Sequence, residues 1–259
     1  MRRLACALFI LLLPAFAAAT NISTDYTDMW WFPDESGWGA NVTQQGDTLF
    51  VTLFVYDAQM NPTWFVAPAT TFQGGTKFSG SMYSTSGPWF GGGPFDPSKV
   101  ATNKIGSLTF EGVTASTAKL FYAVGGIEVT RIVTRQTWRT DILTGLYLGA
   151  REGTWTGCAA DLNGRVDSAA QIGISQNGDD VVIRDAGARY TCTYGGKVRP
   201  AGRYSEIVGE GVCDDHVGHF LKATEVQVSK VGFSMRYIMQ TVGSECNFVG
   251  YVGGIRQLP

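Results

Sequence analysis

The sequence predicts an all-β protein of two consecutive antiparallel β-barrel or meander domains, the second of them disulfide-bonded. Its 33 glycines separate short runs rich in β-branched and aromatic residues, and no stretch beyond residue 19 keeps a helical period. The composition changes near residue 140, because six of the seven tryptophans precede it and four of the five cysteines follow it. Each half has about 120 residues, a typical single-domain size. We expect an aromatic-rich β domain at 20–139 and a disulfide-bonded β domain at 140–259.

Residues 1–19 have the features of a signal peptide. Arg2 and Arg3 form a positive start, residues 4–16 form an apolar run, and the alanines at 17–19 provide small residues for cleavage. The apolar run is too short to stay across a bilayer, and no second run of sufficient length follows it. We therefore expect an exported protein, periplasmic or extracellular, with no transmembrane segment after signal cleavage.

The charge balance argues against nucleic acid as a partner. The chain carries 20 Lys and Arg against 22 Asp and Glu, and two of the basic residues belong to the signal peptide. No basic stripe remains to neutralise phosphates. No P-loop or dinucleotide-binding fingerprint is present, so we expect no cofactor.

The cysteines predict two disulfides in the second half. Removal of the signal peptide takes away Cys6 and leaves Cys158, Cys192, Cys213 and Cys246, an even number in an oxidising compartment. A metal site would need closer pairs such as C-x-x-C, so we expect no metal at these cysteines. Three connectivities are open. We favour Cys158–Cys192 with Cys213–Cys246, each of which closes a segment of roughly 33 residues.

Strand patterns follow one another through the first half. Residues 49–56 form one strand, 57–62 a turn and 63–67 an antiparallel return. Further strands are expected at 77–83, 107–111, 118–124 and 128–134, the last two joined by a hairpin turn at Gly125 and Gly126. Residues 87–95 combine glycine, proline and aromatic residues, which predicts a loop tipped with aromatic side chains.

The second half repeats this style. Residues 171–175 and 181–184 flank Asn177 and Gly178, a strong hairpin signal. Further strands are expected at 189–194, 206–213, 219–227, 233–241 and 246–255. Their regular spacing favours a closed meander or a sandwich.

A faint internal repeat links the two halves. Residues 43–49 (TQQGDTL) align with 175–181 (SQNGDDV), and each segment follows a tryptophan with glycine nearby, Trp38 or Trp155. The spacing differs, and hairpin turns favour Gly-Asp in unrelated proteins as well. Shared ancestry of the halves stays open at this point.

Short motifs in the first half carry a family resemblance. They are W-W-x-P-x-E-S-G-W-G at 30–39, Q-Q-G-D at 44–47, Y-D at 56–57 and P-T-W-F at 62–65. Through them, residues 28–135 resemble a domain of secreted proteobacterial proteins, which is often repeated or attached to other extracellular domains. No activity is established for that family, so the resemblance implies no catalytic residue. The second half is more loosely similar to lipocalin- or avidin-type barrels, which implies a cavity at most.

Aromatic side chains are the candidate binding residues. A stacking platform for a glycan or an apolar ligand could be formed by Tyr56, Trp64, Phe65, Trp89 and Phe90. Separate candidates for ligand binding are Trp31, Trp38 and Glu35. The alternative is that a barrel of this size buries such residues in its core. Trp89 and Phe90 are different, because a glycine-rich loop cannot easily bury them, and we expect an exposed contact patch.

Two patterns invite a chemical interpretation. A carboxylate among tryptophans, such as Glu35, can act as a general acid, but glycoside hydrolysis needs a second positioned carboxylate, and the sequence places none. The alternative is that Glu35 caps a turn beside Gly37. His216 and His219, after two aspartates, suggest a metal site, but they would lie on opposite faces of a strand. We expect a hairpin turn there and no metal.

Together these patterns favour a secreted, non-catalytic binding protein. Aromatic loops or a barrel mouth would bind a glycan, a small apolar molecule or an extracellular protein. The first alternative is an inhibitor of an extracellular enzyme such as a protease, with 87–95 as the presented loop. The second alternative is a glycan-active hydrolase that uses Glu35. No G-x-S-x-G motif supports a serine hydrolase.

Overall fold

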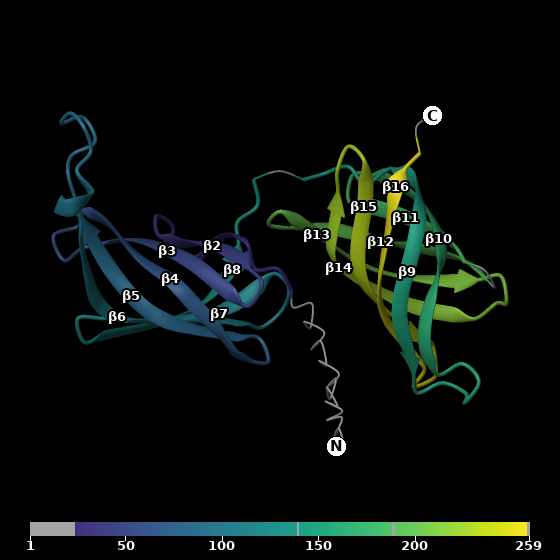
Figure 1. Cartoon of the computed structure of the whole chain (residues 1–259). Coiled ribbons are helices and arrows are strands. Elements are labelled where there is room, and N and C mark those ends of the chain that lie inside the picture. Colours follow the sequence, from purple (N-terminus) through teal and green to yellow (C-terminus); the bar gives the residue numbers. More distant parts are fainter. Residues whose placement is uncertain (1–23, 139, 188–189, 258–259) are drawn as a thin grey trace, which may run out of the picture.

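The computed structural model describes residues 24–138, 140–187 and 190–257, so the signal peptide expected at 1–19 lies outside the described residues. Within these ranges the chain forms sixteen strands and one short 3-10 helix, and no α-helix. The strands build two consecutive closed antiparallel barrels of eight strands each (Figure 1). The predicted all-β class and two-barrel architecture are confirmed.

Barrel 1 is an up-and-down barrel in which each strand pairs with the next and β8 returns to β1. Its strands are β1 (Asp28–Trp31), β2 (Gly39–Gln45), β3 (Thr48–Tyr56), β4 (Pro62–Gly74), β5 (Lys77–Ser86), β6 (Ala101–Gly112), β7 (Thr117–Val124) and β8 (Ile127–Arg135). The 3-10 helix η1 (Pro97–Lys99) lies between β5 and β6. The barrel closes where Trp30 lies opposite Arg135.

Barrel 2 has the same topology. Its strands are β9 (Gly145–Thr156), β10 (Gly164–Asn177), β11 (Asp180–Ala186), β12 (Thr191–Ala201), β13 (Tyr204–Cys213), β14 (Gly218–Val228), β15 (Gly232–Thr241) and β16 (Asn247–Arg256). The barrel closes where β16 pairs with β9, from Asn247 opposite Thr156 to Arg256 opposite Tyr147.

Two predicted hairpins are present. Gly125 and Gly126 connect β7 to β8, and both have positive φ, 58° and 84°, which the tight turn requires. In barrel 2 the turn lies one residue later than expected. Asn177 is the last residue of β10 and pairs with Asp180, and Gly178 (φ 61°) begins the turn.

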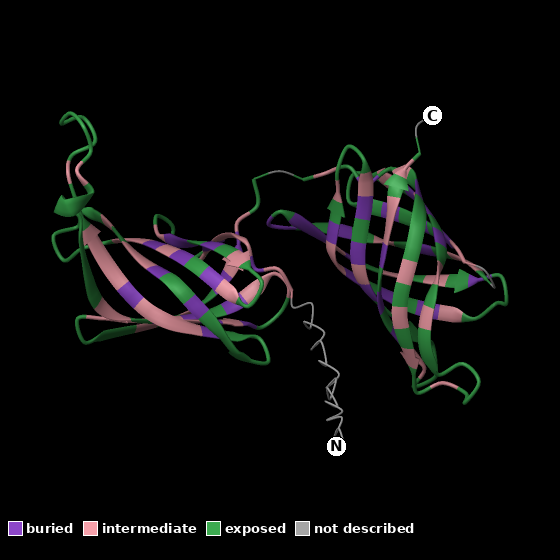
Figure 2. Cartoon of the chain, viewed as in Figure 1, coloured by how far each residue is buried: buried purple, intermediate pink, exposed green. Residues whose placement is uncertain are grey.

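The interior of barrel 1 is filled with side chains. Tyr26, Trp30, Phe78 and Phe110 are at most 2% exposed and pack edge to face or tilted, with ring centroids 5.1 to 6.3 Å apart. Buried and exposed positions alternate along the strands, as expected when one face of a sheet packs inward (Figure 2). Barrel 1 therefore has a packed core.

Barrel 2 packs most tightly at the end where β9 begins. Tyr147 and Phe233 lie there with ring centroids 5.0 Å apart, and Leu143, just before β9, is 1% exposed. Trp155, near the other end of β9, is only partly buried. The interior is closed at one end and less filled at the other.

The disulfides are Cys158–Cys246 and Cys192–Cys213, so the favoured pairing of Cys158 with Cys192 and of Cys213 with Cys246 is wrong. Cys192 lies directly opposite Cys213 on the neighbouring strands β12 and β13. Cys158 and Cys246 meet because barrel closure brings the end of β9 beside the start of β16. Sequence separation carried no information about that closure.

One hydrogen-bond network closes the N-terminal end of barrel 1. Trp30 Nε1 donates to the Tyr26 carbonyl (2.9 Å), and Gln44 Oε1 accepts from the Tyr26 amide (2.9 Å). The Gln44 amide donates to Thr27 Oγ1 (2.9 Å). Arg135 donates to the Thr27 carbonyl (3.1 Å) and stacks over Trp30, 4.7 Å from the ring centroid.

Barrel 2 contains the same network from equivalent residues. Tyr147 donates to the Leu143 carbonyl (2.8 Å), Gln176 Oε1 accepts from the Leu143 amide (2.9 Å), and the Gln176 amide donates to Thr144 Oγ1 (3.0 Å). Arg256 donates to the Thr144 carbonyl (3.0 Å) and stacks over Tyr147 at 5.2 Å. The two barrels therefore repeat one structural unit, as an internal duplication would produce.

This equivalence corrects part of the sequence repeat. The hairpins at 43–49 and 175–181 do correspond, since they join β2 to β3 and β10 to β11. Trp38 and Trp155 do not correspond, because Trp38 precedes β2 whereas Trp155 lies within β9. The residue equivalent to Trp30 in barrel 2 is Tyr147, which a search for tryptophans could not find.

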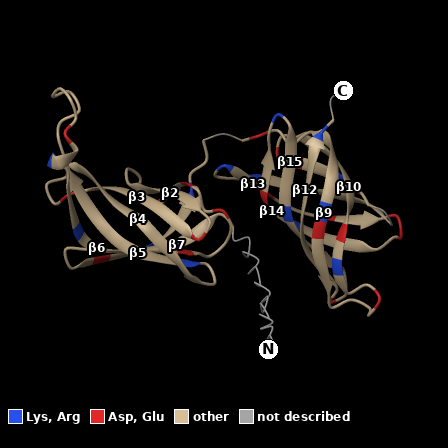
Figure 3. Ribbon diagram, in the orientation of Figure 1, with Lys and Arg blue, Asp and Glu red and all other residues tan. Residues whose placement is uncertain are grey.

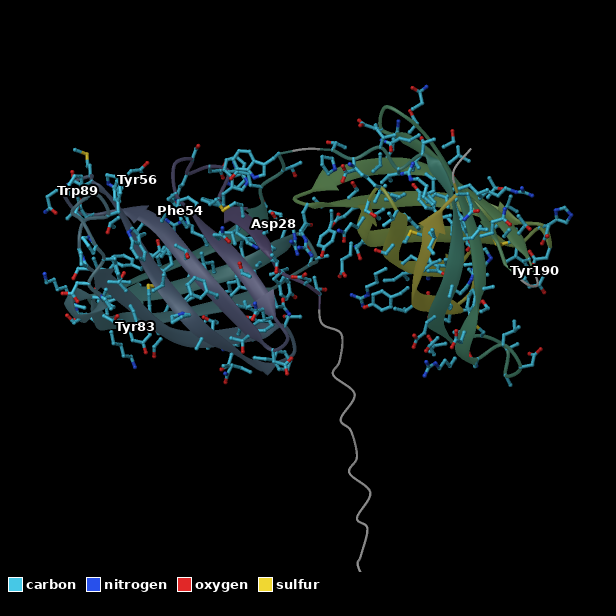
Figure 4. All side chains as sticks on the ribbon, turned by 45° about the horizontal axis from the view of Figure 1, so that its top comes forward. Asp28, Phe54, Tyr56, Tyr83, Trp89 and Tyr190 are labelled. Atoms are coloured by element: carbon cyan, nitrogen blue, oxygen red, sulfur yellow. A yellow bond between two sulfur atoms is a disulfide. The ribbon has the colours of Figure 1, made fainter. Side chains whose placement is uncertain are left out.

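The barrels contact each other through the turn between β12 and β13. Arg135 of barrel 1 is buried, pairs with Asp28 (3.1 Å) and lies 5.1 Å from the ring centroid of Tyr204 in barrel 2. The backbone amide of Arg203 donates to Asp28 Oδ2 (2.9 Å), and that of Gly202 to Thr137 Oγ1 (2.9 Å). Figure 4 shows Asp28 on the side of barrel 1 that faces barrel 2.

Candidate functional site

A cavity of about 670 Å³ occupies the less filled end of barrel 2. All four disulfide cysteines line it, so its mouth lies at the end of the barrel where both disulfides are found. Tyr190 also lines it, and Figure 4 shows this residue at the end of barrel 2 farthest from barrel 1. The volume is within the range of small-molecule sites.

The apolar part of the cavity lies toward the mouth. Trp155 and Phe248 face each other across β9 and β16, with ring centroids 5.1 Å apart, and Met239 also lines the wall. Trp155 reaches the interior because alternate residues of β9, from Tyr147 onward, point inward. These side chains can cover an apolar ligand.

A buried ion pair lies deeper in the cavity. Arg151 donates from Nη1 to Asp185 Oδ2 (2.8 Å) and from Nη2 to Asp185 Oδ1, and the side chains are only 11% and 8% exposed. Gly149 and Gly153, on either side of Arg151 along the inward face of β9, contribute no side chain to the interior. Burial acts to lower the pKa of Arg151, but the hydrogen bonds and charge of Asp185 outweigh it and raise that pKa.

Two buried donors, one of them on Arg151 itself, have no acceptor among the described residues. The Tyr237 hydroxyl, on a residue 2% exposed, lies next to the Arg151 guanidinium but makes no hydrogen bond of good geometry, and Arg151 Nε also has no partner among the described residues. Burial raises the pKa of Tyr237, so its hydroxyl stays protonated. Buried donors normally have an acceptor, so these two mark a polar subsite.

His219 lies on the same wall. Its Nδ1 is 3.3 Å from Thr241 Oγ1, and its ring centroid is 6.5 Å from that of Trp155. Burial lowers the pKa of His219, so the imidazole is neutral at neutral pH. His216 has a φ of 66° in the turn between β13 and β14, which confirms the expected hairpin. The described residues contain no group of three or more His, Cys, Asp or Glu that could hold a metal.

The aromatic residues expected to bind a ligand lie on barrel 1 and do not meet in one cavity. Trp64 and Tyr56 are 51% and 56% exposed on the outer face of β3 and β4, where Trp64 lies opposite Phe54. Trp31 is half-buried beside Thr134 of β8. Trp38 packs edge to face on Tyr122 at 6.4 Å.

Glu35 is held by Arg131. Its carboxylate accepts from Arg131 Nε (2.9 and 3.1 Å) and Nη2 (2.8 Å), and from Trp38 Nε1 (3.1 Å). These hydrogen bonds, those from Arg131 above all, lower the pKa of Glu35, whereas a general acid needs a raised pKa. Asp57, in the turn between β3 and β4, accepts from the backbone amides of Gln59 and Asn61 within that turn.

Trp89 and Phe90 are 70% and 93% exposed, and their ring centroids are 5.8 Å apart. They belong to the loop 87–95, which extends beyond barrel 1 (Figure 1). The loop contains no charged residue, and Figure 3 shows the nearest charges below its tip.

The polar residues Arg151, Asp185 and Tyr237 of the cavity were missed from the sequence, although one signal pointed to the first two. Arg151 stands at an inward position of β9 in line with Tyr147 and Trp155, and Asp185 follows the inward residues Val181 and Ile183 of β11. A charged residue at a strand position that points inward places a polar group in the interior of the barrel. Reading each strand by its period of two would have identified both.

Comparison with known proteins leaves the function open. No family model and no curated protein matches the chain. A crystal structure of a DUF3598 family protein of unknown function from Nostoc punctiforme is 11% identical, with a TM-score of 0.27 over 90% of this chain and 94% of that chain.

Proposed function

We propose that this protein is an exported, non-catalytic binding protein that holds a small, mainly apolar molecule in the cavity of barrel 2. The observation that carries the proposal is the cavity of about 670 Å³, lined by Trp155, Phe248 and Met239. Each 1 Å² of apolar surface that a ligand removes from water contributes about 25 cal/mol. The aromatic walls therefore favour an apolar ligand.

The contrast between the barrels supports this proposal. Eight-stranded barrels are just wide enough either to be filled by side chains or to hold one small ligand. Barrel 1 is filled by side chains, among them Trp30, Phe78 and Phe110 in its core. Barrel 2 has the same strand number but has glycines at inward positions beside Arg151.

Two features support export, the disulfides and the signal peptide expected at residues 1–19. The disulfides Cys158–Cys246 and Cys192–Cys213 are typical of an oxidising compartment. Among the described residues there is no helix with the length and apolar character needed to cross a membrane. Residues 1–19 supply the expected signal peptide.

The test is binding of the neutral fluorescent probe N-phenyl-1-naphthylamine to mature protein. We expect saturable binding with one site per chain. Val166 lines the cavity, so Val166→Phe should weaken binding at least tenfold. Val182 is 49% exposed on the outside of β11, so Val182→Phe is the matched control and should bind like the wild type. Absence of saturable binding, or equal binding by Val166→Phe, contradicts the proposal.

A second candidate function is inhibition of an extracellular enzyme such as a protease by the loop 87–95. The exposure of Trp89 and Phe90 on an uncharged loop favours it. The Trp89→Ser/Phe90→Ser variant should no longer inhibit a protease that the wild type inhibits. Trp138→Ser, a control at another exposed tryptophan, should inhibit that protease like the wild type. A panel of secreted proteases with no inhibition removes this candidate. The hydrolase alternative has less support, because Arg131 holds Glu35 as a carboxylate.

A further inference from the structure

We propose that the ligand is an uncharged molecule with a hydrogen-bond-accepting oxygen, such as a ketone, at one end of an apolar body. The oxygen would accept hydrogen bonds from the Tyr237 hydroxyl and Arg151 Nε. This inference rests on the proposed function, since it names the ligand class of the same cavity.

The polar subsite has more hydrogen-bond donors than acceptors. Within the described part of the chain, the Tyr237 hydroxyl and Arg151 Nε are buried donors without partners. A third donor, the Tyr194 hydroxyl, reaches only Met239 Sδ (2.9 Å), and a thioether is a weak acceptor. Both oxygens of Asp185 are engaged by Arg151. A ligand that complements this subsite must therefore bring an acceptor.

A second constraint on the ligand is the charge of the cavity. The two arginines among its described lining residues are both paired, Arg151 with Asp185 and Arg165 with Glu152 (2.8 Å). His219 is neutral because burial lowers its pKa. The remaining charged lining residues, Asp161 and Asp215, are exposed and acidic. Among the described lining residues a carboxylate ligand would find no free positive charge, and burial of an unpaired charge is strongly unfavourable.

The order of residues along the strands sets the orientation of the ligand. Trp155 lies near the disulfide end of β9 and Arg151 lies four residues deeper, which corresponds to about 13 Å along a strand. On β15, Met239 likewise lies nearer the disulfide end than Tyr237 does. The acceptor oxygen therefore lies at the inner end and the apolar body extends toward the mouth.

The experiment compares 2-decanone, decanoate and decane as competitors for bound N-phenyl-1-naphthylamine. We expect 2-decanone to bind at least tenfold more tightly than decanoate and decane. Tyr237→Phe removes only the hydroxyl. It should weaken the binding of 2-decanone about tenfold and change the binding of decane less than twofold. Tyr251→Phe, at a residue 40% exposed outside β16, is the matched control and should change neither.

The outcomes separate the two proposals. If decane or decanoate binds as tightly as 2-decanone, or Tyr237→Phe binds the ketone like the wild type, the polar subsite is wrong and the cavity proposal stands. If N-phenyl-1-naphthylamine shows no saturable binding, or binds to Val166→Phe as tightly as to the wild type, both proposals are overturned.

Discussion

Among single residues, Arg151 and Asp185 determine the character of the cavity. A buried ion pair contributes little net stability, but removal of one partner leaves an uncompensated charge. We expect Asp185→Ala to lower the free energy of unfolding by about 3 kcal/mol. The double variant Arg151→Met/Asp185→Leu should recover most of that loss. Urea denaturation followed by circular dichroism measures both.

The control for this prediction is the exposed pair of Arg165 with Glu152, whose side chains are 68% and 61% exposed. Exposed pairs contribute little, so Glu152→Ala should change the free energy of unfolding by less than about 1 kcal/mol. Equal effects of Asp185→Ala and Glu152→Ala would show that the Arg151 pair is not buried as described.

Glu35 provides a pH-dependent prediction. Its folded pKa is lowered, chiefly by the hydrogen bond from Arg131, so it contributes stability above the ordinary carboxyl pKa and loses it as the pH falls through the folded pKa. We expect Glu35→Gln to lower the melting temperature at pH 7, and the difference from the wild type to disappear in acid. A difference that grows in acid would contradict the assignment.

At the scale of elements, the arginines that end β8 and β16 close their barrels, and Arg135 does more than Arg256. Arg135 is buried, pairs with Asp28 and stacks on both Trp30 and Tyr204. We expect Arg135→Met to lower the free energy of unfolding by about 3 kcal/mol, because Asp28 is left buried without its partner.

The equivalent change in barrel 2 serves as the comparison. Arg256 stacks on Tyr147 and donates to the Thr144 carbonyl, and these contacts involve no buried carboxylate. Arg256→Met should therefore lower the free energy of unfolding less than Arg135→Met does in the same chemical denaturation experiment. The reverse order would show that the contact between the barrels contributes little.

The disulfides differ in the length of chain that they close. Cys158–Cys246 spans 88 residues and Cys192–Cys213 spans 21. In the chain-entropy model the longer loop gives about 1 kcal/mol more stabilisation. We expect a Cys158→Ser/Cys246→Ser variant to be less stable than Cys192→Ser/Cys213→Ser by about that amount. Equal stabilities in urea would argue against an entropic origin.

The class of fold and several local turns were predictable from the sequence, whereas the long-range pairing of the cysteines was not. The turn at Gly125 and Gly126 depends on a few neighbouring residues, so it was predictable. The pairing of Cys158 with Cys246 depends on the closure of β9 on β16, which no local pattern encodes. The cavity is the volume that the eight strands of barrel 2 leave unfilled, and no local pattern encodes such a volume. The concentration of tryptophans in the first half pointed to barrel 1 instead.

For the whole molecule, the two barrels are one structural unit used in two ways. Barrel 1 is filled by its aromatic residues, and its N-terminal end contacts the β12–β13 turn of barrel 2 through Asp28 and Arg135. Barrel 2 keeps its interior open at the far end, where Tyr190 lies. We interpret barrel 1 as the support and barrel 2 as the binding unit.

The most direct test of this assignment is methyl NMR of the methionines during titration with 2-decanone. Met239 lines the cavity, whereas Met82 is buried in barrel 1 and Met60 is exposed on it. We predict that the Met239 methyl resonance shifts saturably and that those of Met60 and Met82 do not move. Saturable shifts at Met60 or Met82 with none at Met239 would contradict the placement of the site in barrel 2.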